Sequence, residues 1–155
     1  MNDPFDDFVD DLQAQIDAET RADFGEVVYQ RWKNPLYMQV LPQADGHARE
    51  TGNCGDSIEI FLAVENGRVT DAGFQTDGCG PSAVCGSYAA ELAIGRTPLE
   101  ITEITGETIL SILGGLPSEH EHCAFLATAA LQSALEDYMS RHRQNPLSSP
   151  PHSSP

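Results

Sequence analysis

The sequence predicts an α+β fold in which helices pack on a three-stranded antiparallel sheet. Apolar side chains alternate from Ile58 to Val64, which is the period of a half-buried strand. Asn66-Gly67 follows and is typical of a two-residue hairpin turn. From Pro81 onward, apolar residues recur at helical spacing instead. A chain of 155 residues suits one compact domain with tails.

The first 26 residues predict an acidic helical extension that precedes the domain. They hold nine acidic residues and one basic residue, which is −8 of the formal charge of −16. Asp3 and Pro4 suit the cap and the first position of a helix. Apolar residues recur on one face of this helix, at Phe5, Phe8, Leu12 and Ile16. We expect the helix to pack on the domain, and docking to a partner is the alternative.

The domain is expected to span residues 27–141 and to continue as an antiparallel meander. A helix over about residues 20–32 ends before Pro35, because proline disfavours helix in the residue before it. The hairpin joins strands at about 58–64 and 69–76. A third strand is expected just before Cys54, which places Cys54 in the turn between two strands.

Helices are expected to follow the sheet. The first covers 82–94 and stops at Gly95, and the second begins at a capping box over 97–100. A short helix over 107–113 stops at two glycines, and a capping box over 118–121 begins the last helix. Residues 142–155 form a tail rich in Pro and Ser, which we expect to be disordered.

The composition excludes several classes of function. A formal charge of −16 repels phosphate backbones, so neither nucleic acid nor an anionic membrane is an expected partner. The sequence has no apolar run of about 18 residues, and its N-terminus is acidic where a signal peptide is basic. We therefore expect a cytoplasmic protein whose thiols stay reduced and whose partners present basic patches.

Three of the four cysteines stand beside glycines or at an expected helix start. Cys54 is followed by glycine, Cys79 lies between two glycines, and Cys123 follows His122 near the start of the last helix. Unpaired N–H groups and the helix dipole stabilise a thiolate at a helix start. Such places bury a thiol poorly, so we expect the three thiols to be accessible and reactive.

Asp56 and His122 are the candidate ligands besides sulfur. Residues i and i+2 of an extended segment project to the same side, so Cys54 and Asp56 can address one ion. The alternatives are a turn residue at Asp56 and a solvated side chain at His122. Cys85, on the expected 82–94 helix, is interpreted as a small buried apolar residue. The alternative is a spare thiol that relays sulfur or swaps into the site.

This set of residues predicts a site for a soft metal. Three thiolates with an oxygen or nitrogen ligand suit zinc or an iron–sulfur cluster. A structural zinc would favour CxxC pairs, which the sequence lacks, and an electron-transfer cluster is normally held by four cysteines. The set therefore indicates a looser site that can release its metal. In a reducing compartment this interpretation is favoured over a disulfide framework.

The motifs resemble those of the IscU/NifU iron–sulfur scaffold proteins over about residues 27–139. They are Asn34-Pro35, Gly52-Asn53-Cys54-Gly55-Asp56, Gly78-Cys79-Gly80, and Leu116-Pro117 followed by His122-Cys123-Ala124. The resemblance implies the same α+β fold. It also implies a scaffold that receives persulfide sulfur from a cysteine desulfurase, takes up iron, builds a [2Fe–2S] cluster and hands it to apoproteins.

The resemblance further implies roles for residues and partners. Cys54, Cys79 and Cys123 would bind the cluster, and Cys123 would be the persulfide acceptor. Asp56 would tune the lability of the cluster, and His122 would be an exchanging ligand. The implied partners are a desulfurase, apo iron–sulfur clients and an electron donor such as a ferredoxin. The protein would be a monomer or weak dimer, would not be an enzyme, and would carry zinc in some as-isolated preparations.

Two other functions are weighed against the scaffold. A zinc-bound sulfur acceptor of the SufU type would have an insertion between its second and third cysteines and lack the histidine before the third. This chain has 43 residues between Cys79 and Cys123 and keeps His122, which favours IscU and NifU. A thiol enzyme is ranked last, because adjacent helical residues point about 100° apart and His122 would be badly placed to activate Cys123.

Overall fold

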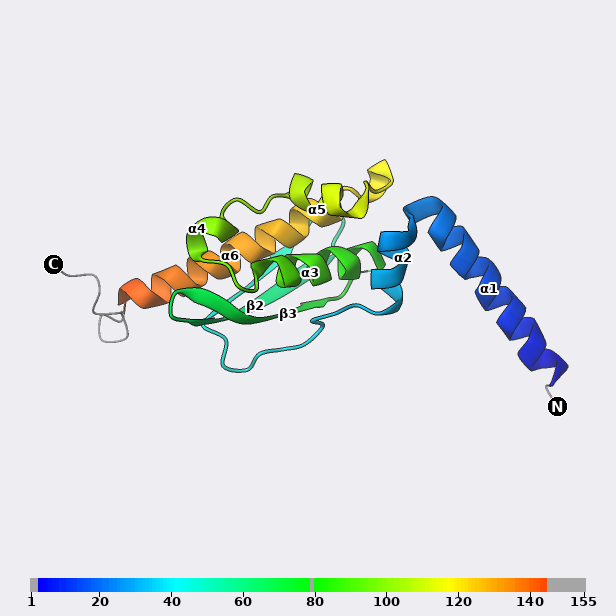
Figure 1. Cartoon of the computed structure of the whole chain (residues 1–155), viewed down its shortest axis with the longest axis horizontal. Helices are drawn as coiled ribbons and strands as arrows, with labels where there is room; N and C mark the ends of the chain where they lie inside the picture. The colour runs from blue at the N-terminus through cyan, green and yellow to red at the C-terminus, as the bar shows by residue number, and fades with distance from the viewer. Residues whose placement is uncertain (1–2, 79, 145–155) are drawn as a thin grey trace.

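The computed structural model describes residues 3–78 and 80–144. In chain order the elements are α1 (Pro4–Phe24), α2 (Glu26–Lys33), β1 (Gly46–Thr51), β2 (Ser57–Glu65), β3 (Arg68–Thr76), α3 (Gly80–Ala93), α4 (Pro98–Ile101), α5 (Gly106–Leu113), the 3₁₀ helix η1 (Ser118–His120) and α6 (His122–Gln144). Figure 1 shows helices α3 and α6 packed along the sheet and α1 projecting from one end of the body. The predicted α+β class is confirmed.

The sheet is an antiparallel meander in the order β1-β2-β3, as predicted. The last pair between β1 and β2 sets Thr51 opposite Ser57, which closes the loop that carries Cys54. At the other hairpin, Asn66 and Gly67 have φ of 55° and 77°, as a type I′ turn requires. The predicted place of Cys54, in the turn between two strands, is confirmed, and so is the Asn66-Gly67 hairpin.

The core lies between the sheet and the helices. Ile58, Ile60 and Leu62 of β2 point into it and have no exposed surface. Helix α6 packs on β1 and β2, and α3 packs on β3. Alanines line the inner faces of both helices, which lets these faces pack closely: Ala89, Ala90 and Ala93 in α3, and Ala124, Ala127, Ala130 and Ala134 in α6.

Short helices connect α3 to α6. The predicted capping box at α4 is present, because Thr97 and Glu100 each accept a hydrogen bond from the other's backbone N–H. A second box caps α5, where Thr105 and Thr108 do the same, and the sequence pattern had not indicated it. Helix α5 ends at Gly114, whose φ of 76° suits glycine.

The predicted start of the last helix is wrong. Residues 118–120 form a separate 3₁₀ turn in which the His120 N–H donates to the Pro117 carbonyl at 2.8 Å. Ser118 makes no side-chain cap, so there is no capping box here. Pro117 fixes the backbone direction ahead of the turn, and α6 begins afresh at His122. His122 and Cys123 are therefore the first two residues of α6.

The expectation that the N-terminal helix packs on the domain is also wrong. No residue of α1 is buried, and Phe5 and Phe8 are 68% and 63% exposed. The break between α1 and α2 falls at Gly25, whose φ is 89°, and not near residue 20. This left-handed glycine turns the chain between the two helices. α1 reaches the rest of the protein mainly through α2.

Helix α6 ends the described part of the chain. It continues to Gln144, so residues 142–144, which were expected to begin the tail, are helical. The prediction of disorder for residues 145–155 lies outside the described residues. Within residues 3–78 and 80–144, no helix is long and apolar enough to cross a membrane.

Candidate functional site

The segments that carry the predicted ligands meet at one end of the sheet. They are the β1–β2 loop, the connection from β3 to α3, and the junction of η1 with α6. The side chain of Ser82, in the first turn of α3, contacts both Asp56 and Cys123. Folding thus brings together residues that lie far apart in the sequence.

Cys54 is exposed on the β1–β2 loop. The Gly52 N–H donates to the Asp56 carbonyl at 2.9 Å, and the Gly55 N–H donates to the Gly52 carbonyl at 3.0 Å. Gly55 has φ of 93°, a conformation that other residues adopt only with strain. These bonds close a tight loop that presents the Cys54 thiol to the outside, as expected.

Cys123 lies at the start of α6 but is 1% exposed, which corrects the expectation of an accessible thiol. The Ser82 hydroxyl, in the first turn of α3, lies 3.5 Å from the Cys123 Sγ, and the sequence context of Cys123 gives no sign of this neighbour. His122 precedes it and is exposed. The His122 Nε2 lies 3.8 Å from the Cys123 Sγ.

This contact also corrects the argument that His122 points away from Cys123. The angle of about 100° between successive helical residues concerns where their side chains start, whereas the imidazole of His122 can turn about its own side-chain torsions. The imidazole can therefore fold back over the neighbouring sulfur. A nitrogen at this distance can exchange a proton with the thiol, because a sulfur hydrogen bond is longer than one between nitrogen and oxygen.

Ser82 lies between the Asp56 carboxylate and the Cys123 sulfur, and it is not among the predicted site residues. Its hydroxyl lies 3.4 Å from the Asp56 Oδ2 and 3.5 Å from the Cys123 Sγ. Ser82 is fully buried, whereas Asp56 is half-buried. A serine three residues after Cys79 is an unremarkable first-turn residue in sequence, so only the fold identifies it.

The two glycines beside position 79 are both closely packed. A Cβ on Gly78 would lie 2.7 Å from the Ser82 Oγ and 2.9 Å from the Asp56 Oδ2. A Cβ on Gly80 would lie 1.9 Å from the ring of Trp32 in α2. The absence of both side chains therefore lets Asp56 and Trp32 approach this connection. Cys79 itself, a predicted ligand, lies outside the described residues.

Cys85 is buried on α3 with no exposed surface, so the favoured interpretation of a small core residue is confirmed. Burial raises the pKa of its thiol far above the usual range, and the nearby charge of Cys123 raises it further. Because a thiol acts as nucleophile or ligand in its ionised form, Cys85 is poorly suited to either role.

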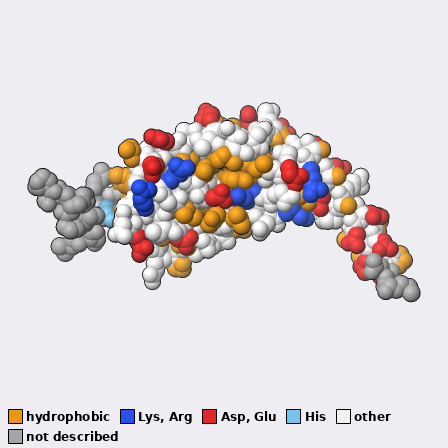
Figure 2. Space-filling model, in the orientation of Figure 1, with side chains coloured by type: hydrophobic (Ala, Val, Ile, Leu, Met, Phe, Trp, Pro, Cys, Tyr) orange, Lys and Arg blue, Asp and Glu red, His pale blue; other side chains and the backbone are white. Residues whose placement is uncertain are grey.

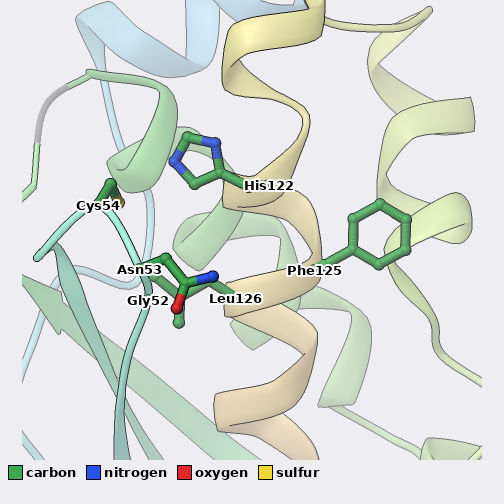
Figure 3. A pocket seen from close by; sticks show the side chains of 6 residues that line it. All are labelled: Gly52, Asn53, Cys54, His122, Phe125 and Leu126. Atoms are coloured by element: carbon green, nitrogen blue, oxygen red, sulfur yellow. The ribbon is translucent and has the colours of Figure 1, made fainter.

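A hollow lies between the β1–β2 loop and the first turns of α6. Cys54 and Asn53 line it from the loop, and His122 and Leu126 line it from the helix. In Figure 3, His122 projects toward the loop of Cys54, whereas Phe125 points to the other side of α6, toward α5. One exposed thiol and one imidazole thus face a shared, solvent-open space.

The described donors are suited to a soft metal but do not form a closed cage. Within residues 3–78 and 80–144, no three His, Cys, Asp or Glu side chains stand close enough together to hold a metal ion. The donors instead lie in two connected groups. Cys54 and His122 face the hollow, and Asp56 and Cys123 meet through Ser82. His122, which touches Cys123, joins the groups.

Comparison with known proteins identifies the family. The model of the NifU-like N terminal domain matches residues 23–145. The chain is 36% identical over 121 residues to the iron-sulfur cluster assembly scaffold protein IscU 1 of Archaeoglobus fulgidus. That match covers 77% of this chain and 78% of the relative.

Solved structures share the fold. The N-terminal part of a nitrogen-fixing NifU-like protein from Brucella abortus matches with a TM-score of 0.63 at 16% identity, over 78% of this chain and 97% of that one. A putative iron-sulfur cluster assembly scaffold protein for the SUF system, from Fervidobacterium islandicum AW-1, matches with a TM-score of 0.58 at 17% identity, over 75% and 98%. At these identities the likeness concerns the fold alone.

Proposed function

This chain belongs to the family of the NifU-like N terminal domain, and we propose from that membership that it is an assembly scaffold for iron–sulfur clusters. Iron and sulfur are its cargo, so it turns over no small-molecule substrate. The observation that carries the proposal is the meeting of Cys54, Asp56, His122 and Cys123, from distant parts of the sequence, at one open end of the sheet.

Cys54, Cys79 and Cys123 are the proposed thiolate ligands of the cluster, which is of the [2Fe–2S] type. Three thiolates leave one position for a weaker donor, and Asp56 and His122 are the two candidates at hand. Cys54 reaches the cargo from the exposed loop, and Cys123 reaches it from the start of α6. The open hollow beside Cys54 gives the cargo a route in and out.

Cys123 is the proposed persulfide acceptor. Its thiolate attacks the outer sulfur of a cysteine persulfide on a desulfurase. The donor's S–S bond breaks as the new S–S bond forms, and the donor leaves as a cysteine thiolate. The His122 Nε2, 3.8 Å away, accepts the thiol proton beforehand. Because Cys123 is 1% exposed, the desulfurase reaches it only when the side chains above it move aside.

Sulfur delivered in this way still has to be reduced. The outer sulfur of a persulfide has oxidation number zero and takes up two electrons to become sulfide. Each iron(II) gives only one electron on becoming iron(III), whereas each sulfur needs two. A reductant such as a ferredoxin supplies the remaining electrons. The finished cluster is then handed to apo iron–sulfur client proteins.

The test is the metal and acid-labile sulfide content of the protein after anaerobic purification from cells that co-express a cysteine desulfurase. We expect iron and sulfide in roughly equal amounts, and their loss in Cys54→Ala. Cys85→Ala is the matched control, because this buried thiol is not a proposed ligand, and it should retain both.

Zinc without sulfide, persisting after attempted cluster reconstitution, would favour a zinc-bound sulfur acceptor instead. Zinc in the first preparation does not decide the question, since three thiolates also bind zinc well. Retention of iron and sulfide in Cys54→Ala would remove Cys54 from the ligand set.

A further inference from the structure

Helix α1 carries an apolar stripe that nothing in the described part of the chain covers. The large apolar side chains of its first 13 residues, Pro4–Ile16, are exposed from 44% to 68%: Phe5, Phe8, Val9, Leu12 and Ile16. On a helix with 3.6 residues per turn these positions fall on one face. The matched family region begins at residue 23, so nearly all of this helix lies outside it.

The rest of the surface of α1 is acidic. Asp6 and Asp11 flank the stripe, and Asp7 and Asp10 lie on the opposite side of the helix. Figure 2 shows acidic and apolar side chains along the projecting arm. An anionic membrane and a second copy of this helix would both repel this charge. The complementary surface is an apolar groove whose rims carry Arg and Lys.

Contacts at the base of α1 fix its direction. Lys33 pairs with Asp17 at 3.6 Å, and Arg21 pairs with Glu26 at 3.2 Å. The Arg21 guanidinium also lies 4.2 Å from the centre of the Tyr29 ring. Tyr29 is buried in α2, so α1 is joined to an anchored element, although its own apolar stripe stays uncovered.

The base of α1 lies at the end of the molecule that carries the candidate site. The Phe24 ring lies 5.3 Å from the ring of Trp32 and 5.5 Å from that of His120, centre to centre. Trp32 packs against Gly80, next to position 79, and His120 stands two residues before His122. A protein that binds α1 is therefore positioned near the site.

We propose that α1 is a docking helix for the sulfur-donor protein of this scaffold, which offers an apolar groove with basic rims. The inference rests on the proposed function and adds the means by which the donor is recruited. The donor binds again in every round of assembly, and it must place its persulfide close to the buried Cys123 thiol. A second contact near the site raises the effective concentration of the persulfide there.

The test measures transfer of labelled sulfur from the cysteine desulfurase of the same organism to the full chain. We compare Phe8→Ser/Leu12→Ser, which disrupts the stripe, with Ala14→Ser/Ala18→Ser on the opposite face. We expect the first variant to need about tenfold more scaffold for half-maximal transfer, as loss of interface anchors implies. The second should remain within about twofold of the wild type, since it leaves the anchors in place.

A second pair of variants tests the basic rims, and both variants change the net charge by the same amount. Asp6→Asn/Asp11→Asn and Asp7→Asn/Asp10→Asn each remove two negative charges, but only the first pair flanks the stripe. We expect the flanking pair to weaken transfer more, and the difference to shrink at high salt. Equal effects of the two pairs would overturn the assignment of basic rims.

Assembly from inorganic sulfide and iron(II), without any donor, separates the two proposals. All variants should then build clusters as the wild type does. If Phe8→Ser/Leu12→Ser also accepts donor sulfur normally, the docking inference is wrong and the scaffold stands. If the wild type builds no cluster from sulfide and iron, the proposed function falls, and the inference falls with it. A change in self-association of the chain, with normal sulfur transfer, would identify a second copy as the occupant.

Discussion

Among single residues, the site depends on a few side chains that lie near one another but make only long hydrogen bonds. Ser82 is within reach of both Asp56 and Cys123, at 3.4 and 3.5 Å. These contacts are longer than strong hydrogen bonds, so the Asp56 carboxylate is held loosely near the sulfur. This loose placement supports the proposal that Asp56 is a weak iron ligand.

Asp56→Ala should slow the transfer of the cluster to an apo-ferredoxin, by roughly tenfold if the effect is like that of other changes around metal sites. The reason is that a weak ligand is lost and a stronger donor can take its place. Circular dichroism of the receiving ferredoxin follows the transfer. Asp71→Ala, on an exposed part of β3, is the control. An unchanged rate for Asp56→Ala would remove this carboxylate from the release step.

Among the secondary-structure elements, α2 and α3 approach each other closely because position 80 is a glycine. Helix α2 lies against the start of α3 through the Trp32 ring, which occupies the space of a Gly80 side chain. Arg31 of α2 also donates to the Ser87 hydroxyl and the Glu91 carboxylate of α3, each at 2.9 Å. The two helices are thus held together at both points, and Trp32 has little freedom to move away.

Gly80→Ala should lower the free energy of unfolding by about 1–3 kcal/mol, the usual cost of an overpacked contact. The added Cβ would lie 1.9 Å from the rigid indole, so α2 or α3 must shift. Urea denaturation measures the change. Gly52→Ala is the matched control, because its Cβ would meet Leu126 at an ordinary 3.5 Å. Equal stability of the two variants would show that Trp32 yields easily.

At the scale of the whole molecule, the chain combines a packed α+β body with an acidic arm. Half of the net charge of −16 falls in the first 26 residues, and none of the residues of α1 is buried. The core of the body lies between the sheet and the helices, chiefly α3 and α6. We therefore expect substitutions in the stripe of α1 to affect the proposed docking, and substitutions in the core to affect stability.

A matched pair of substitutions tests this separation. Phe74→Ala, at a fully buried position in β3, should cost about 3–5 kcal/mol of the free energy of unfolding. Phe8→Ala, at a position that is 63% exposed in α1, should change it by less than about 0.5 kcal/mol. Both are measured by urea denaturation. A large loss of stability in Phe8→Ala would mean that α1 packs on the body after all.

Local patterns in the sequence determined the strands, the hairpin and the cysteines of interest. Alternation along β2, the Asn66-Gly67 turn and the Thr97 capping box depend on neighbouring residues, so they can be recognised without the fold. The position of Cys54 in a turn between two strands followed from the same patterns. The motifs around the cysteines also carried the resemblance to the family that the comparisons confirm.

Which of these groups are buried, and which lie next to one another, depends on the packing of distant segments. The burial of Cys123, the bridging position of Ser82 and the close approach of Trp32 to Gly80 all depend on segments that are distant in sequence. Whether α1 packs or projects was equally open, because an amphipathic stripe indicates a contact without indicating its partner. Sequence patterns report the preferences of neighbouring residues, whereas burial and proximity arise from the packing of the whole chain.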